Sequence, residues 1–224
     1  VMRDWRSDVC SSDRLHVNLY AESEGVVPAV AGGAVCVRQE TRYPWDGEVR
    51  FILAPEKPAD FTLALRIPDR AESALYRVEP DLGGAFLVSV NGKVCSVPSA
   101  KGYARVRRVW QAGDRVTLLL PLPVQRVRCD ERVAANRGRV AVQRGPVVFS
   151  FEDADHAWPV KDGTLARDAG LKAVWWDDML GGTMTVEGGG WIGVPNYARL
   201  NRGGWSQVWL LEGGVAGGHM RTAQ

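Results

Sequence analysis

Three acidic residues, Glu152, Asp153 and Asp155, directly follow the apolar segment 147–151. Paired carboxyl groups act as acid and base in glycosidases, where they face each other across the sugar at about 5 to 9 Å. Close neighbours at the exit of a strand do not adopt that arrangement. The spacing therefore favours a charged loop over a catalytic pair.

The tryptophans are the second set of residues with possible chemistry, because an indole face can stack on a sugar ring. The chain contains nine of them, and most are expected in the core, including Trp110 at the end of a strand. Neighbouring strand residues point to opposite faces, so only one member of an adjacent pair can join a given platform. The candidates for sugar contact are Trp175, Trp176, Trp191 and Trp205.

The sequence contains no local pattern of a nucleophile or a metal site. Its four cysteines lack C-x-x-C spacing, its three histidines are widely separated, and neither H-E-x-x-H nor G-x-S-x-G occurs. We therefore predict no catalytic residue, no metal ligand and no cofactor in this chain. Isolated cysteines in alternating segments favour a reducing, cytoplasmic compartment. The residues concerned are Cys10, Cys36, Cys95, Cys129, His16, His156 and His219.

The composition is that of a globular protein with a substantial core. With 224 residues, 46% of them hydrophobic, the chain has room for one large domain or two smaller ones. A formal net charge of +2 with interspersed signs argues against nucleic acid as a partner. The densest basic cluster, Arg105, Arg107 and Arg108, is interpreted as a solvated strand edge. No apolar run reaches the roughly 18 residues of a membrane span, so no membrane partner is expected.

The segment 41–68 gives the strongest strand signal in the chain. Residues 48–53 and 61–67 alternate with period two, which is typical of strands with one buried face. Before the first strand, 43–47 contains a proline and an Asp-Gly pair that favour a turn. Pro68 ends the second strand because it lacks a backbone donor. The segment therefore predicts two strands, with a turn before the first and a proline at the end of the second.

Further alternating segments lie on both sides, at 15–20, 86–94, 103–110, 116–120 and 140–151. Frequent turn signals and the absence of a long helical pattern predict an all-β protein of two consecutive antiparallel β-sandwich units. The expected boundaries are 14–123 for the first unit, 124–212 for the second, and 213–224 for a flexible Gly-rich tail.

The first 13 residues have no hydrophobic periodicity, and their pattern does not continue into the strand that follows. They resemble DWSSDVCSSD, a phrase that arises when a sequencing adapter is translated. Residues 1–13 are therefore interpreted as a non-native head and excluded from the reasoning on the fold.

Several blocks together resemble one enzyme family. TRYPWDG, LRIP, RRVWQAGD and GRVAVQRGP are similar to the region that follows the catalytic helical barrel in family-127 glycoside hydrolases, the β-L-arabinofuranosidases and their relatives. The pattern departs at His16, Ser150, Arg70, Asn196 and Arg199, and the last three stand where aromatic residues are usual. The residues that carry the resemblance are Tyr43, Pro44, Trp45, Asp46, Gly47, Arg66, Pro68, Trp110, Gly113, Asp114, Arg144, Gly145, Pro146, Asn201, Arg202 and Gly203.

The resemblance implies a parent enzyme that hydrolyses terminal β-L-arabinofuranosyl units with retention. It further implies a zinc-bound cysteine thiolate as nucleophile and a glutamate as acid/base, all within the barrel. No residue of this chain matches them, and Cys10 is too close to the strand at Leu15 to be that nucleophile. We therefore expect a non-catalytic C-terminal part that buttresses the barrel of the same polypeptide.

Two alternatives remain open at this point. The tryptophans suit a carbohydrate-binding β-sandwich module with an oligosaccharide as partner. A protein-interaction scaffold is the other alternative, since a surface made to meet a barrel exposes an apolar patch when the barrel is absent.

Overall fold

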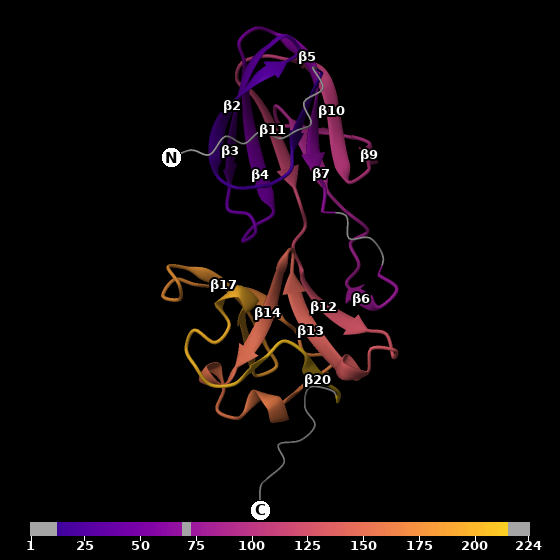
Figure 1. Ribbon diagram of the computed structural model, residues 1–224, viewed down its shortest axis with the longest axis vertical. Helices are drawn as coiled ribbons and strands as arrows, with labels where there is room; N and C mark the ends of the chain where they lie inside the picture. Colours follow the sequence, from indigo (N-terminus) through magenta and orange to yellow (C-terminus); the bar gives the residue numbers. More distant parts are fainter. Residues whose placement is uncertain (1–12, 69–72, 215–224) are drawn as a thin grey trace, which may run out of the picture. The chain divides into compact units, whose positions relative to one another are not determined.

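The computed structural model describes residues 13–68 and 73–214, and in this part strands dominate while each helical element is a single short 3₁₀ turn. The chain divides into two compact units (Figure 1). The prediction of an all-β fold with antiparallel β-sandwich units is confirmed. Among the described residues, no helix has the length and hydrophobicity that crossing a bilayer requires.

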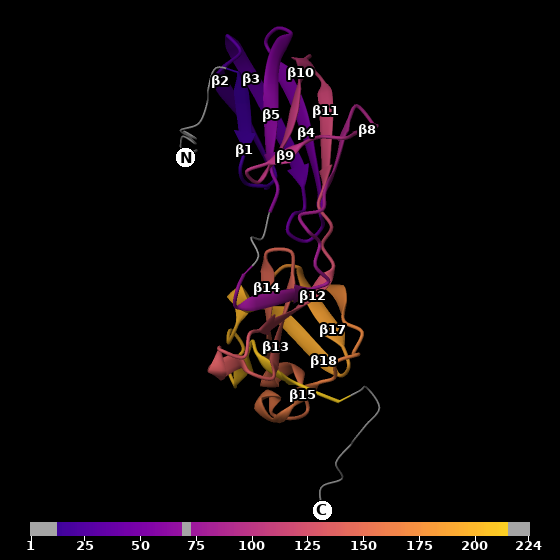
Figure 2. The same ribbon diagram turned by 90° about the vertical axis from the view of Figure 1, so that its right-hand side faces the viewer.

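The first unit, unit 1, contains two sheets. Its four-stranded sheet has the order β1-β5-β10-β9, in which β1 and β5 are parallel and lie side by side (Figure 2). These strands are β1 (Arg14–Val17), β5 (Ala59–Arg66), β10 (Tyr103–Trp110) and β9 (Ser99–Ala100). The six-stranded sheet follows the order β2 (Ser23–Val30), β3 (Gly33–Thr41), β4 (Glu48–Pro55), β11 (Asp114–Leu119), β7 (Leu87–Val90) and β8 (Lys93–Cys95).

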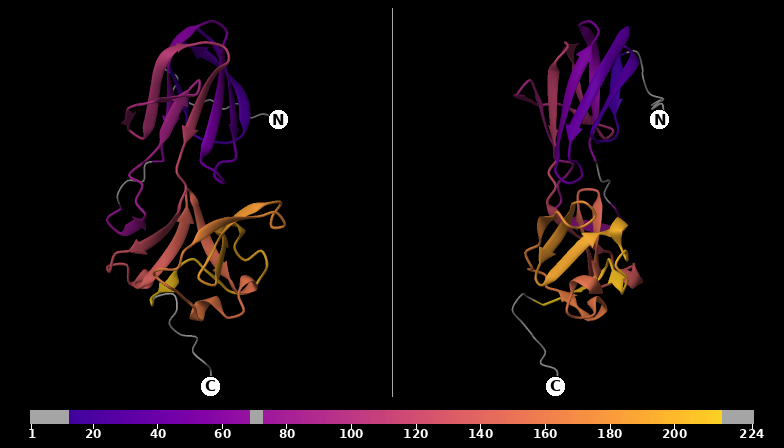
Figure 3. Two further views of the ribbon diagram at one scale, coloured as in Figure 1. Left: turned by 180° about the vertical axis from the view of Figure 1, so that it is seen from behind. Right: turned by 90° about the vertical axis from the view of Figure 1, so that its left-hand side faces the viewer.

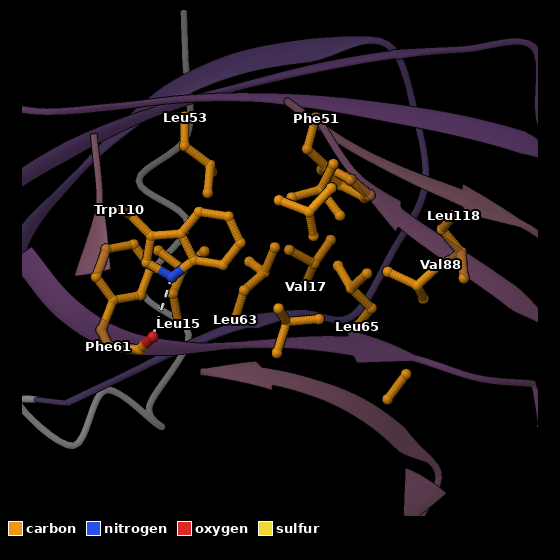
Figure 4. Packing of buried hydrophobic residues seen from close by; sticks show 14 of the residues in the cluster. Leu15, Val17, Phe51, Leu53, Phe61, Leu63, Leu65, Val88, Trp110 and Leu118 are labelled. Carbon is orange, nitrogen blue, oxygen red and sulfur yellow. Dashed lines mark hydrogen bonds between the residues drawn. The ribbon is translucent and has the colours of Figure 1, made fainter. Parts of the chain in front are cut away.

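Alternating apolar residues of both sheets form the core of unit 1 (Figure 4). Trp110 is completely buried, and its indole Nε1–H donates to the carbonyl oxygen of Phe61 at 3.0 Å. The two rings lie 5.9 Å apart between centroids. The strand signal of segment 41–68 therefore corresponds to β4 and β5, which supply Phe51, Phe61 and Leu63 to this core.

The turn between β3 and β4 is closed by side-chain hydrogen bonds. The Thr41 hydroxyl donates to the Glu48 carbonyl at 2.6 Å, and Asp46 Oδ1 accepts from the Glu48 N–H at 3.1 Å. Leu120 N–H donates to the Gly47 carbonyl at 2.9 Å, which anchors the turn to the end of β11. The motif TRYPWDG thus folds as a rigid connection within unit 1.

The second unit, unit 2, is built on a ten-stranded sheet in which β13, β14, β18 and β17 are neighbours. Its hairpin of β17 and β18 is seen from behind in Figure 3. The strands are β6 (Tyr76–Glu79), β12 (Val124–Cys129), β13 (Arg139–Arg144), β14 (Val147–Glu152), β15 (Thr164–Leu165), β16 (Lys172–Trp176), β17 (Thr183–Gly188), β18 (Trp191–Pro195), β19 (Ser206–Gln207) and β20 (Leu210–Glu212). The 3₁₀ turns are η1 (Ala134–Asn136), η2 (Asp153–Asp155), η3 (Val160–Asp162) and η4 (Asn196–Ala198).

The division of the chain differs in one respect from the boundaries expected from sequence. Residues 73–81 belong to unit 2 although they lie between β5 and β7 of unit 1. The reason is that β6 pairs with β12, while Gln125 Nε2 donates to the Pro80 carbonyl at 2.7 Å. Of the expected head and tail, residues 1–12 and 215–224 lie outside the described residues, and the Asp13 carbonyl accepts a hydrogen bond from Thr62 N–H.

Candidate functional site

Two of the acidic residues at the end of β14, Glu152 and Asp155, are bound by Arg202. Glu152 is fully buried, and its Oε2 accepts from Arg202 Nη2 at 2.8 Å while its Oε1 accepts from Leu200 N–H at 2.5 Å. The same guanidinium donates to both carboxylate oxygens of Asp155, at 2.6 and 2.5 Å. Hydrogen bonds that Arg202 donates to Asp155 and Glu152 raise the pKa of its guanidinium against the opposing effect of burial.

The remaining polar groups of this cluster are also committed to the fold. Asp153 Oδ1 accepts from Val160 N–H at 2.8 Å. His156 Nε2 accepts from Ile192 N–H at 3.1 Å, so Nδ1 carries the proton and donates to the Glu152 carbonyl at 2.7 Å. The acids considered for catalysis therefore accept hydrogen bonds from donors within unit 2. Glu152 thereby ties β14 to the segment 199–202, and His156 ties the end of β14 to β18.

A second ionic cluster, centred on Glu212, connects β20 to β12 and β6. Arg128 donates to both oxygens of Glu212, at 2.6 and 2.7 Å, and also contacts Glu79. Arg126 adds a contact to Glu212 at 3.1 Å and donates to the carbonyls of Ala166 and Ala169. Burial raises the pKa of Glu212, but the hydrogen bonds and charges of Arg128 and Arg126 outweigh it and hold this pKa below its usual value.

The Glu212 cluster predicts a loss of stability in acid. Because the folded-state pKa of Glu212 is depressed, its contribution is present above the ordinary glutamate value of about 4.3 and is lost as the pH falls through the folded value. Glu212→Gln should lower the free energy of unfolding of unit 2 by roughly 2 kcal/mol at neutral pH and flatten its decline in acid. Urea unfolding across this pH range measures both effects.

The matched control for this prediction is Glu131→Gln, because Glu131 pairs with Arg137 on the surface and its side chain is 86% exposed. The control should retain the wild-type dependence on pH. If the free energy of unfolding of the Glu212→Gln variant falls as steeply in acid as that of the wild type, this cluster does not set the pH dependence.

The four candidate tryptophans do not share one environment. Trp191 is 3% exposed and packs against Phe151, His156 and Trp158. On β16, Trp175 Nε1 donates to Asp177 and Trp176 Nε1 donates to Glu187, and the two adjacent residues have opposite faces. Trp205 is 56% exposed. The structure thus leaves Trp205 as the tryptophan of this set with a largely exposed ring.

The motif residues of both units serve packing and turn formation. Asp114 accepts from Asn91 Nδ2 at 2.8 Å and from Gln111 N–H at 2.9 Å, which closes the turn before β11. Arg66 Nη1 donates to the Gly102 carbonyl at 3.1 Å. Gly145-Pro146 connects β13 to β14, and a Cβ at Gly145 would lie 2.7 Å from Leu122. Sequence reasoning marked these positions by resemblance.

Unit 1 also has a shallow hollow of about 610 Å³ on the outside of β3 and β4, beside the turn at 43–47. Its lining is mainly charged, and none of the candidate tryptophans lies in this unit. Among the described residues, no group of three histidine, cysteine, aspartate or glutamate side chains is placed to hold a metal ion. The lining residues are Glu22, Arg38, Glu40, Thr41, Arg42, Asp46, Gly47, Glu48, Arg50 and Leu119.

Comparison with known families matches nearly the whole of this β region. Residues 14–122 match the middle domain of glycoside hydrolase family 127, described as β-L-arabinofuranosidase, and residues 124–211 match the C-terminal domain of the same family. The chain belongs to glycoside hydrolase family 127. Its predicted resemblance to the region beyond the barrel is thereby confirmed.

Individual family-127 proteins show the same relationship. The non-reducing end β-L-arabinofuranosidase of Bifidobacterium longum subsp. longum is 32% identical over 161 residues, which cover 67% of this chain and 22% of that protein. The crystal structure of a family-127 β-L-arabinofuranosidase from Geobacillus stearothermophilus T6 is similar with a TM-score of 0.79 and 35% identity, over 92% of this chain and 34% of that one.

A second solved structure, described as a family-127 β-arabinofuranosidase, gives a TM-score of 0.83 at 29% identity, over 90% of this chain and 35% of that one. The chain therefore spans between about a fifth and about a third of the length of these relatives.

Proposed function

We propose that this chain is the non-catalytic support of a family-127 glycoside hydrolase and buttresses a helical catalytic barrel of the same polypeptide. The observation that carries the proposal is the match of the two units to the middle and C-terminal domains of that family. The acidic cluster agrees with it, because Glu152, Asp153 and Asp155 bind donors within unit 2 and leave no pair of carboxylates facing a sugar.

The proposed activity of the whole enzyme is the release of terminal β-L-arabinofuranosyl units. In this proposal the zinc, the nucleophilic cysteine and the acid/base glutamate are supplied by the barrel, and zinc keeps the thiolate deprotonated. The described part of this chain contributes rigidity. Its cores and ionic clusters hold two β units in fixed internal geometry, against which a barrel can pack.

The test joins the barrel of the Geobacillus stearothermophilus enzyme to residues 14–214 in place of its own middle and C-terminal domains. We expect the joined protein to unfold at a higher temperature than the barrel alone. A barrel that is insoluble alone and folds when joined supports the proposal equally. A barrel whose unfolding temperature is the same in both forms would overturn it.

A further inference from the structure

The outer face of the four-stranded sheet in unit 1 is covered by arginine side chains. Along β1, β5 and β10, the residues that point inward form the core, including Leu15, Leu63 and Val106. By alternation, the opposite face carries the basic residues of the same strands. We call this set the arginine face, and it consists of Arg14, His16, Arg66, Arg105 and Arg107.

Strand register arranges the face as two basic rows on either side of a row of small residues. Thr62 lies between Arg14 and Arg107, and Ala64 lies between His16 and Arg105. Although Thr62 and Ala64 point away from the core, Thr62 is 9% exposed and Ala64 is fully buried. The stems of the flanking side chains therefore cover the middle strand and hold their charged groups above it.

The described residues of this face carry more positive than negative charge. Arg107 pairs with Asp60 at 3.2 Å, and Arg14 lies 3.8 Å from the carboxylate of Asp13. Both pairs are largely exposed, so each contributes little to stability and is available for exchange with another partner. The side chain of Arg105 has no acidic partner among the described residues.

One polar group beside these arginines also lacks a hydrogen-bond partner. His16 Nδ1 is buried and has no hydrogen-bond partner in the described structure. The rings of His16 and Tyr103 are nearly perpendicular, with their centroids 5.3 Å apart. The Arg66 guanidinium carbon lies 5.4 Å from the centroid of the Tyr103 ring. This contact keeps the Arg66 guanidinium beside His16 and Tyr103. Among the described residues of this face, four guanidinium groups thus stand against the carboxylates of Asp13 and Asp60.

We propose that the arginine face is the docking surface for an acidic surface of the catalytic barrel. This inference rests on the proposed function and names the part of unit 1 that meets the barrel. A small ligand is disfavoured, because binding pockets are concave and here the fully buried Ala64 leaves no recess between the rows. Guanidinium groups form bidentate hydrogen bonds with carboxylates, so the complementary surface is rich in aspartate and glutamate.

The test uses the joined protein described above, with Arg14→Glu and Arg105→Glu together. The matched control is Arg38→Glu with Arg115→Glu, which makes the same charge change on exposed positions of the six-stranded sheet. The double reversal on the arginine face should lower the unfolding temperature of the barrel by about 5 °C or more, while the control leaves it unchanged. Raising the salt concentration should also lower the unfolding temperature of the barrel joined to the wild-type chain.

Amide exchange in β5 of the same variants confirms that unit 1 remains folded. If both double variants behave like the wild type while the joined barrel is still stabilised, the proposed function holds and the arginine face is not its docking surface. If the wild-type chain gives the barrel no stability at all, the proposed function itself fails. Tighter binding of an acidic polysaccharide than of the barrel to this face would also overturn the assignment.

Discussion

Replacing Arg202 by methionine is expected to destabilise unit 2 by about 3 to 5 kcal/mol, because the change leaves a buried carboxylate without its charged partner. Glu152 is fully buried and would keep only the hydrogen bond from Leu200 N–H. Asp155 would lose both of its contacts to the guanidinium. Hydrogen exchange measured by mass spectrometry reports the two units separately and therefore localises the loss.

The control for this variant is Arg137→Met, since Arg137 pairs with Glu131 on the surface of the same unit. This change should cost no more than about 0.5 kcal/mol. Adding Glu152→Gln to Arg202→Met should restore part of the stability, because it removes the uncompensated charge. An Arg202→Met variant as stable as the control would contradict the structural role of the cluster.

Replacing Trp110 by alanine is expected to cost about 3 to 5 kcal/mol in the free energy of unfolding of unit 1. The side chain is completely buried between the two sheets, where it contacts Phe61 and donates to that residue's carbonyl (Figure 4). Its removal leaves a large cavity and takes away the hydrogen bond that the indole donates to the Phe61 carbonyl. Urea unfolding followed by circular dichroism measures the loss.

The same substitution at an exposed tryptophan supplies the comparison. Trp205→Ala should change the free energy of unfolding by about 0.5 kcal/mol or less, because the Trp205 side chain is 56% exposed. Trp110→Phe separates packing from hydrogen bonding and should cost less than Trp110→Ala. Equal losses at positions 110 and 205 would show that burial does not distinguish these residues.

Local sequence signals predicted the strands of segment 41–68 well because alternation is a short-range property. The residues 48–53 and 61–67 correspond closely to β4 and β5, and their apolar positions form the core. The position of β6 could not be predicted in this way. Its sequence Tyr-Arg-Val-Glu has no buried face of its own, and its place in unit 2 depends on pairing with β12, which lies far along the chain.

The ionic clusters escaped prediction for the same reason. Glu152 and Arg202 are 50 positions apart, and Arg128 and Glu212 are 84 apart. Resemblance marked Arg202 as a motif residue, but no local pattern assigned its partners. The grouping of Glu152, Asp153 and Asp155 was visible in the sequence, whereas the burial of Glu152 depends on a donor brought to it by the tertiary fold.

The most direct test of the central claim is the release of L-arabinose from a β-L-arabinofuranoside by this chain alone, with zinc supplied and a family-127 enzyme as positive control. The support proposal predicts no release above the buffer blank, and no change when zinc is chelated. Release that rises with protein concentration and disappears on chelation would contradict the account, since it would locate catalytic groups within these β units.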